Sequence, residues 1–171
     1  MYLKFLVYSL FVCILLSCKS AAPKTSHRAK YEPPRVNSAG HATHPAVKKA
    51  RTYLGTPYKY CGLDHHGIDC SGLVYVSFKE MHIDLPRMAN DQSKRGKRVY
   101  IGELSEGDLV FFKEKKNGSS KKITHVGIIS SSNYPNSVTF IHSSTSKGVR
   151  EDELMSGYWK DLYVMAVRID G

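Results

Sequence analysis

The chain has 171 residues and a formal net charge of +10, which allows for one domain with one hydrophobic core. This basic balance suits an anionic partner such as nucleic acid, a membrane surface or an acidic wall polymer. The Lys and Arg residues are scattered, with no arginine-rich helix and no basic stripe interleaved with aromatic residues, which argues against nucleic acid as the partner.

Residues 1–17 resemble an export signal. Lys4 supplies a short positive start, and residues 5–16 are almost all apolar but too few to span a bilayer comfortably. The segment ends in Leu15-Leu16-Ser17-Cys18, which is similar to the lipobox of bacterial lipoproteins, where cleavage before the cysteine precedes its lipidation. We therefore expect a lipoprotein signal peptide at 1–17 and a lipidated Cys18. An uncleaved anchor and a soluble secreted protein are the alternatives.

A tether follows the lipidated cysteine. Residues 18–42 are rich in Lys, Ala, Pro and Ser and show no apolar periodicity, so they predict a flexible linker without chemistry of its own. Lys19 after the cysteine, rather than Asp, fits the default outer-membrane destination in a Gram-negative cell. We expect the folded domain, residues 43–171, to be lipid-anchored to the outer membrane and to face the periplasm.

The folded domain begins with helices and continues with strands. Periodicity and caps predict a first helix at 45–54, a second from Cys70 to about His82 and a short third at 90–94. The later apolar runs predict strands, joined in part by a hairpin connection at 130–137, at 98–101, 107–112, 123–129, 138–142 and 163–169. Helices followed by an antiparallel sheet of about five or six strands are typical of the α+β class.

Cys70 opens the second predicted helix and is the candidate nucleophile. Apolar or small residues recur from it at helical spacing, and Asp69 before it is a good N-cap. At a helix N-terminus, the unpaired N–H groups and the positive end of the helix dipole favour a thiolate over a thiol. A buried, inert cysteine and a Cys61–Cys70 disulfide are the alternatives, because both cysteines lie in the folded part.

Two histidines on predicted strands are placed to serve a cysteine nucleophile. Such a nucleophile needs a base, and the base needs a third group to orient it. His125 lies on one strand with Gly127 two residues on, where a glycine would leave room for a substrate backbone, and His142 ends the next strand. We expect His125 to take the proton from Cys70 and His142 to accept a hydrogen bond from the other ring nitrogen of His125.

Several short motifs occur together and in order across the folded part. They are Gly55-Thr56-Pro57-Tyr58, Asp69-Cys70-Ser71-Gly72-Leu73-Val74, Leu85-Pro86-Arg87, Gln92, Gly107-Asp108-Leu109-Val110-Phe111-Phe112, His125-Val126-Gly127-Ile128 and Phe140-Ile141-His142. With this ordered set the chain resembles the NlpC/p60 family of cell-wall cysteine peptidases, over about residues 43–169. The resemblance implies a papain-like core, with the N-terminal helices packed on the antiparallel sheet.

The resemblance also implies roles for the matching residues. The catalytic residues that it implies are the nucleophile Cys70, the base His125, the third polar residue His142 and Tyr58, whose hydroxyl would help to stabilise the oxyanion. The backbone N–H of Cys70 would be a second oxyanion donor. Asp69 and Ser71 match positions that contact the substrate. No cofactor and no metal are implied, and a zinc site formed by Cys61, Cys70, His125 and His142 lacks a recognisable ligand spacing.

The activity implied by the resemblance is that of a peptidoglycan endopeptidase. We expect a monomer that binds peptidoglycan stem peptides and cuts the amide between D-γ-glutamyl and a diamino acid such as meso-diaminopimelate. The alternatives are a non-catalytic wall-binding lipoprotein and a hydrolase of the same fold that acts on another amide or ester. The chain departs from many members at Tyr60-Cys61-Gly62, where they have Trp-Gly-Gly, and at Met88-Ala89, where they have hydroxyl residues.

Overall fold

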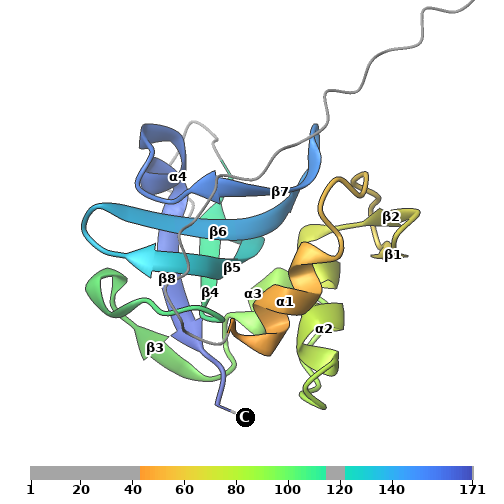
Figure 1. Cartoon of the computed structure of the whole chain (residues 1–171), viewed down its shortest axis with the longest axis horizontal. Helices are drawn as coiled ribbons and strands as arrows, with labels where there is room; N and C mark the ends of the chain where they lie inside the picture. The colour runs from red at the N-terminus through yellow and green to blue at the C-terminus, as the bar shows by residue number, and fades with distance from the viewer. Residues whose placement is uncertain (1–42, 115–121, 171) are drawn as a thin grey trace, which may run out of the picture.

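Three helices and a small hairpin form the first half of the domain. In the computed structural model, which describes residues 43–114 and 122–170, α1 (Pro45–Arg51) packs beside α2 (Cys70–Lys79), and α2 also contacts α3 (Ala89–Gln92) (Figure 1). Between α1 and α2, the strands β1 (Leu63–Asp64) and β2 (Gly67–Ile68) pair with each other. All three predicted helices are present, and each is shorter than its predicted range.

Six antiparallel strands form one sheet in the order β3-β8-β4-β5-β6-β7. The strands are β3 (Lys97–Val99), β4 (Leu109–Lys113), β5 (Ile123–Asn133), β6 (Ser137–Ser144), β7 (Gly148–Glu153) and β8 (Tyr163–Arg168). A 3₁₀ turn, Ile101–Glu103, precedes β4, and the short helix α4 (Gly157–Leu162) leads into β8. The predicted α+β class and the six-stranded antiparallel sheet are confirmed.

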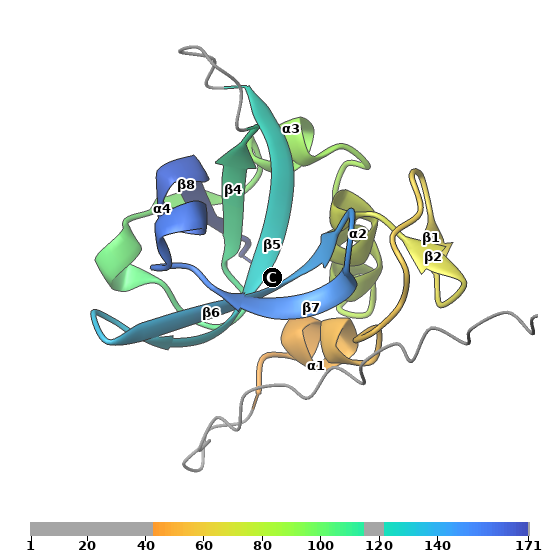
Figure 2. The same ribbon diagram turned by 90° about the horizontal axis from the view of Figure 1, so that it is seen from above.

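Alternation along the strands divides the hydrophobic core between the two faces of the sheet. On β4, Phe111 belongs to the cluster that includes Leu73 of α2, whereas the next residue, Phe112, belongs to the cluster on the opposite face. Leu162 of α4 is buried in that second cluster, and Trp159 packs against it. The sheet therefore separates α1 and α2 from α4 (Figure 2). Cys70 lies with the first cluster.

Two elements near the C-terminus, β7 and α4, are absent from the sequence prediction. The β7 sequence, GVREDE, has no apolar run, and it becomes a strand by pairing along its whole length with β6. Helix α4 has six residues, too few to show helical periodicity. The predicted connection at 130–137 is also too long, because β5 and β6 remain paired as far as Asn133 and Ser137.

The predicted signal peptide (1–17), the lipidation site Cys18 and the tether (18–42) lie outside the described residues. These assignments therefore stay predictions from the sequence. Within residues 43–114 and 122–170, no helix has both the length and the apolar character needed to cross a membrane.

Candidate active site

The Asp69 carboxylate fixes the start of α2 and, with it, the position of Cys70. Asp69 Oδ1 accepts the Gly72 N–H at 2.7 Å, which is the predicted N-cap hydrogen bond. Asp69 Oδ2 accepts the backbone N–H of Cys61 at 2.8 Å. Arg87 donates to both oxygens, at 2.9 and 2.6 Å, and forms a bidentate ion pair. One carboxylate thus joins α2 to the loop before it and to the segment after it.

Ser71 is held by the same segment. Arg87 Nη1 donates to Ser71 Oγ at 3.0 Å, and the buried Gln92 side chain donates to the Ser71 carbonyl at 3.0 Å. Asp69 and Ser71 are both buried beside Cys70, with protein partners on their polar atoms. Contact of these two residues with a stem peptide stays a prediction. Arg87 and Gln92, which the sequence singled out only within motifs, have a clear positioning role.

Cys70 lies at a point where the sheet opens. The β5–β6 ladder ends at the pair Ile128 and Ile141, and α2 packs against both strands. In the part of β5 before that pair, the Val126 N–H acts as a hydrogen-bond donor to the Cys70 sulfur. The thiol therefore lies next to the residue that follows His125, with 8% of the Cys70 surface exposed.

Burial dominates the acidity of this thiol. Desolvation raises the pKa of Cys70 to about 11, against the effect of the Val126 and Ser71 N–H groups, which lower it. The Asp69 charge raises the pKa further. The N–H groups at the helix start lower the pKa of Cys70, as predicted, but burial outweighs them. The expectation of a thiolate is therefore wrong for the free protein. At neutral pH Cys70 is a thiol.

The sequence left a disulfide and a zinc site as alternatives for Cys70. Cys61 and Cys70 are both free thiols, so the disulfide considered from the sequence is wrong. Among residues 43–114 and 122–170, no three His, Cys, Asp or Glu side chains are grouped to hold a metal ion, which leaves the zinc alternative without support. Cys61 is exposed and has a φ of +58°, a left-handed conformation that favours glycine. A glycine would adopt this φ more easily than the cysteine does.

The imidazoles of His125, on β5, and His142, on β6, face each other. His125 Nε2 and His142 Nδ1 are 2.9 Å apart, and the two rings meet edge to face. A hydrogen bond between the two rings is confirmed, whereas its direction and the catalytic roles of both residues stay predictions. Its geometry leaves Nδ1 of His125 as the ring nitrogen available to another partner.

Aromatic rings of the second core cluster surround the two imidazoles. Trp159 stacks on His125 with ring centroids 5.5 Å apart and meets His142 edge to face at 4.8 Å. Phe112 and Phe140 pack against the same pair. Burial here lowers the pKa of His125 to about 3, and the nearby His142 acts in the same direction. At neutral pH the His125 ring is therefore uncharged and able to accept a proton.

The absence of a side chain at Gly127 allows the ring of Phe140 to pack against β5. A Cβ at this position would lie 2.5 Å from the ring of Phe140 and 3.1 Å from the Ile141 carbonyl oxygen. The space beside Gly127 is thus filled by the aromatic ring that stacks on His142. The expectation that this glycine leaves room for a substrate backbone is wrong.

Tyr58 approaches the site from the loop after α1. Its backbone forms a bridge with Ile68, the last residue of β2 and two residues before Cys70. Burial raises the pKa of the Tyr58 hydroxyl, and the neighbouring Cys70 and Asp69 act in the same direction. The hydroxyl therefore stays protonated at neutral pH and is able to donate a hydrogen bond.

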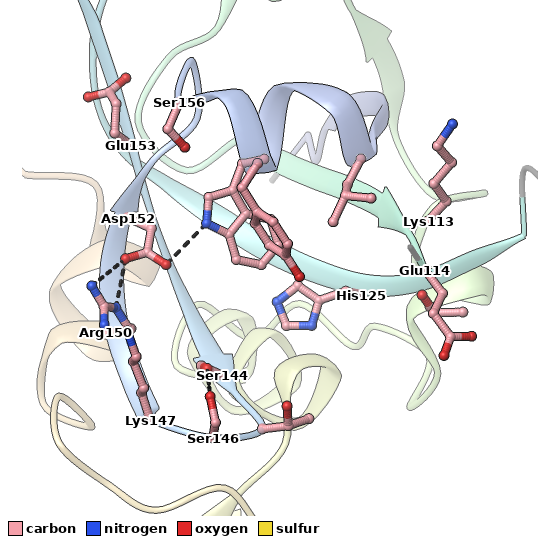
Figure 3. Close-up of a pocket in the computed structure, with 15 residues that line it drawn as sticks. Lys113, Glu114, His125, Ser144, Ser146, Lys147, Arg150, Asp152, Glu153 and Ser156 are labelled. Atoms are coloured by element: carbon pink, nitrogen blue, oxygen red, sulfur yellow. Dashed lines mark hydrogen bonds and ion pairs between the residues drawn. The ribbon is translucent and has the colours of Figure 1, made fainter. Parts of the chain in front are cut away.

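A cavity of about 720 Å³ opens beside His125, bordered by the turn after β6, by β7 and by α4 (Figure 3). His125 forms part of its wall, together with Lys113, Lys147 and Asp152. The lining is mixed: charged side chains and the hydroxyl-rich turn after β6 lie beside apolar side chains of α4, such as Trp159 and Leu162. A cavity of this size has room for a short peptide segment.

Two residues at the site, Asp152 and Trp159, are missing from the sequence prediction. Asp152 Oδ2 lies 3.0 Å from His142 Nε2 and accepts the Trp159 indole N–H at 3.1 Å. Arg150 Nε donates to the other oxygen, Asp152 Oδ1, at 2.7 Å. These residues come from the two elements without apolar periodicity. The sequence offered one hint of a role for Trp159, which is the single tryptophan of the chain.

Comparison with known proteins places the chain in a family. The sequence model of the NlpC/P60 family matches residues 55–168. The chain belongs to the NlpC/P60 family, as its motifs predicted. The protein named "Probable endopeptidase NlpC" of Escherichia coli (strain K12) is 35% identical over 160 residues, which cover 93% of this chain and 99% of that protein.

Further relatives are longer than this chain. The "Bifunctional muramidase/DL-endopeptidase CwlT" of Bacillus subtilis (strain 168) is 41% identical over 124 residues, which cover 72% of this chain and 35% of CwlT. The crystal structure of an NlpC/P60 family protein from Bacillus cereus has a TM-score of 0.63 and 28% sequence identity, over 72% of this chain and 39% of that one. The fold and the family therefore agree.

Replacing Arg87 with Gln tests the Asp69 anchor. Burial raises the pKa of Asp69, but the hydrogen bonds from Arg87 and Gly72 outweigh it and hold that pKa below its usual value. This stabilisation is present above the unfolded-state pKa of about 4 and is lost as the pH falls through the folded-state value. We expect Arg87→Gln to lower the free energy of unfolding by about 2 kcal/mol at neutral pH, and by less at about pH 3.

Urea unfolding of both proteins at the two pH values measures this difference. Lys94→Gln is the matched control, because Lys94 pairs with Asp91 on the exposed surface and its loss should cost no more than about 0.5 kcal/mol. An Arg87→Gln loss that is as small as the control, or the same at both pH values, contradicts the anchor.

The reactivity of Cys70 tests its protonation state. Because its pKa is raised to about 11, the rate of its alkylation by iodoacetamide should still rise with pH above about 8.5, where an ordinary cysteine begins to level off. Peptide mass spectrometry assigns the label to Cys70, and Cys61 in the same digest controls for the reagent. A rate that is already constant near neutral pH would show a preformed thiolate.

Proposed function

We propose that this protein is a peptidoglycan endopeptidase that uses Cys70 as its nucleophile. The observation that carries the proposal is the thiol at the start of α2, next to the β5 segment that carries the hydrogen-bonded pair His125–His142. Membership of the NlpC/P60 family supports the reaction class. The names of two relatives, an endopeptidase and a DL-endopeptidase, support a substrate in the cell wall.

The reaction starts from a neutral pair. As the Cys70 sulfur attacks the carbonyl carbon of the scissile amide, a C–S bond forms, the thiol proton moves to His125 Nδ1, and the carbonyl electrons move to oxygen. Among the described residues no hydrogen bond yet joins the sulfur to the His125 ring. Such bonds often form only when the substrate is bound.

The tetrahedral intermediate carries its negative charge on the former carbonyl oxygen. The Tyr58 hydroxyl, kept protonated by its raised pKa, and the backbone N–H of Cys70 are the donors that we propose for it. The bridge to Ile68 holds the backbone of Tyr58 beside the site, and the cap on Asp69 fixes the backbone N–H of Cys70 before the substrate arrives. Donors that need no rearrangement stabilise a transition state most effectively.

Collapse of this intermediate breaks the C–N bond. His125 returns its proton to the departing amine, and the acyl half stays on Cys70 as a thioester. A water molecule then attacks the thioester while His125 takes one of its protons. When the C–S bond breaks, that proton returns to the Cys70 sulfur, and a carboxylic acid leaves. Every proton is accounted for by one thiol, one imidazole and one water.

We further propose that the scissile bond joins D-γ-glutamyl to a diamino acid such as meso-diaminopimelate. The acyl half would lie toward Asp69 and Ser71, and the amine half would occupy the cavity beside His125. Lys113 and Lys147 on the cavity wall suit the carboxylates of a stem peptide. The word "DL-endopeptidase" in the name of CwlT supports this choice of bond.

The leader sequence supports a proposal about where in the cell the protein acts. We propose that Cys18 is lipidated and anchors a monomeric domain to the outer membrane, facing the periplasm. The lipobox-like end of residues 1–17 and the Lys after Cys18 support this location. A cell-wall substrate is within reach of a domain on such a tether.

Digestion of purified muropeptides, followed by mass spectrometry, tests the function. The wild type should release fragments cut after D-glutamate, whereas Cys70→Ala should be slower by a factor of about 10³ or more, because no thioester can form. Cys61→Gly is the matched control and should keep its activity, since Cys61 has a positive φ that glycine adopts easily. Equal cleavage by wild type and Cys70→Ala refutes the proposal. Fragments from another bond correct the bond and leave the class intact.

A further inference from the structure

A continuous chain of hydrogen bonds runs behind the candidate base. His125 Nε2 and His142 Nδ1 are 2.9 Å apart, and His142 Nε2 and Asp152 Oδ2 are 3.0 Å apart. From this chain we propose that Asp152 is a positioning residue, which sets through His142 the tautomer of His125 and so leaves Nδ1 free to take the Cys70 proton. The inference rests on the proposed role of His125 as the base.

Each hydrogen bond in this series has a defined donor, because the Asp152 carboxylate at its end can only accept. Burial raises the pKa of Asp152, but the hydrogen bonds from His142 and Trp159 and the charge of Arg150 outweigh it and hold that pKa below its usual value, so Asp152 is a carboxylate at neutral pH. His142 Nε2 must therefore carry the proton that lies between His142 and Asp152.

The proton on His142 then determines which nitrogen of His125 is protonated. Burial lowers the pKa of His142 more strongly than Asp152 raises it, so the ring is neutral and holds a single proton. With that proton on Nε2, His142 Nδ1 can only accept, and His125 Nε2 must donate to it. The neutral His125 ring then has a lone pair on Nδ1, which is the atom a general base needs.

Strand register places Asp152 for this task. In the β6–β7 ladder, His142 lies opposite Arg150 and Phe140 lies opposite Asp152. Residues two apart on a strand share a face, so Asp152 is the diagonal neighbour of His142 on the face that carries the aromatic cluster. The position of the carboxylate thus follows from the pairing of β7, the edge strand of the sheet.

Other contacts hold the Asp152 carboxylate in one orientation. Arg150 Nη2 and Nε lie 2.6 and 2.7 Å from Oδ1, and the Trp159 indole N–H donates to Oδ2 at 3.1 Å (Figure 3). Arg150 therefore occupies one oxygen and leaves the other to His142. Trp159 links the carboxylate to the same indole that stacks on His125.

The alternative is that Asp152 only ties the edge strand to Arg150. An Asn at position 152 separates the two roles, because its amide can turn its NH₂ toward His142 Nε2. His142 would then carry its proton on Nδ1, His125 would carry its own on Nδ1, and the base would be blocked. Removal of the orienting carboxylate in a serine protease triad acts in the same way.

Nitrogen-15 NMR of the purified protein near neutral pH measures both tautomers without a substrate. In the wild type we expect both rings to be protonated on Nε2. In Asp152→Asn we expect a shift toward protonation on Nδ1, together with a loss of roughly 10- to 100-fold in kcat and little change in KM. Asp152→Glu, which restores an acceptor, should recover the wild-type tautomers and most of kcat.

Asp91→Asn is the matched control. Its carboxylate pairs with Lys94 on the exposed surface, so neither the tautomers nor kcat should change. Wild-type tautomers and kcat in folded Asp152→Asn overturn the proposal, as do wild-type rings protonated on Nδ1. If Asp152→Asn does not fold, failure of Asp152→Glu to keep the Nε2 tautomers overturns it. If the tautomers respond but the wild type cuts no muropeptide, the proposed function fails and the role of Asp152 in setting the tautomers stands.

Discussion

One buried carboxylate, that of Asp69, determines where the reactive thiol lies. It caps α2, holds the loop at Cys61 and binds Arg87 through both oxygens. A helix cap contributes about 1 kcal/mol, and a charged pair removed from water is stable only with hydrogen bonds on its remaining atoms. Here every oxygen of the carboxylate has such a partner. Cys70, the next residue, is fixed because Asp69 cannot move without breaking all of these contacts.

The candidate site forms where the helical part meets the opened sheet. The end of α2 that carries Cys70 packs where the β5–β6 ladder stops, and the imidazole pair lies under the aromatic rings of the other face. Because the protein surrounds both groups, burial shifts the pKa of the thiol up and that of His125 down. The site therefore stores an uncharged thiol and an uncharged base. In the proposed reaction the charged nucleophile would arise only when the proton moves, which would limit side reactions of the resting protein.

The sequence alone was sufficient to predict where residues lie when they belong to a motif or to a periodic apolar pattern. Asp69 and Cys70 were placed at the helix start by a cap and an apolar stripe, and the His125–His142 contact followed from two neighbouring strands. The protonation state of Cys70 was not accessible, since it depends on how completely α2 and β5 cover the thiol. Asp152 was not accessible either, because β7 is a strand only by pairing with β6 and its residues show no pattern of their own.

The proposed mechanism depends on a neutral His125 that activates a neutral Cys70. The pH dependence of kcat/KM for muropeptide cleavage tests it most directly, since its acid limb reports the base of the free enzyme. With the pKa of His125 lowered to about 3, the base stays unprotonated as the pH falls, so kcat/KM should be nearly constant between about pH 7 and 5 while the protein remains folded. A fall of about tenfold per pH unit that begins near the ordinary imidazole value of about 6.5 would contradict the account.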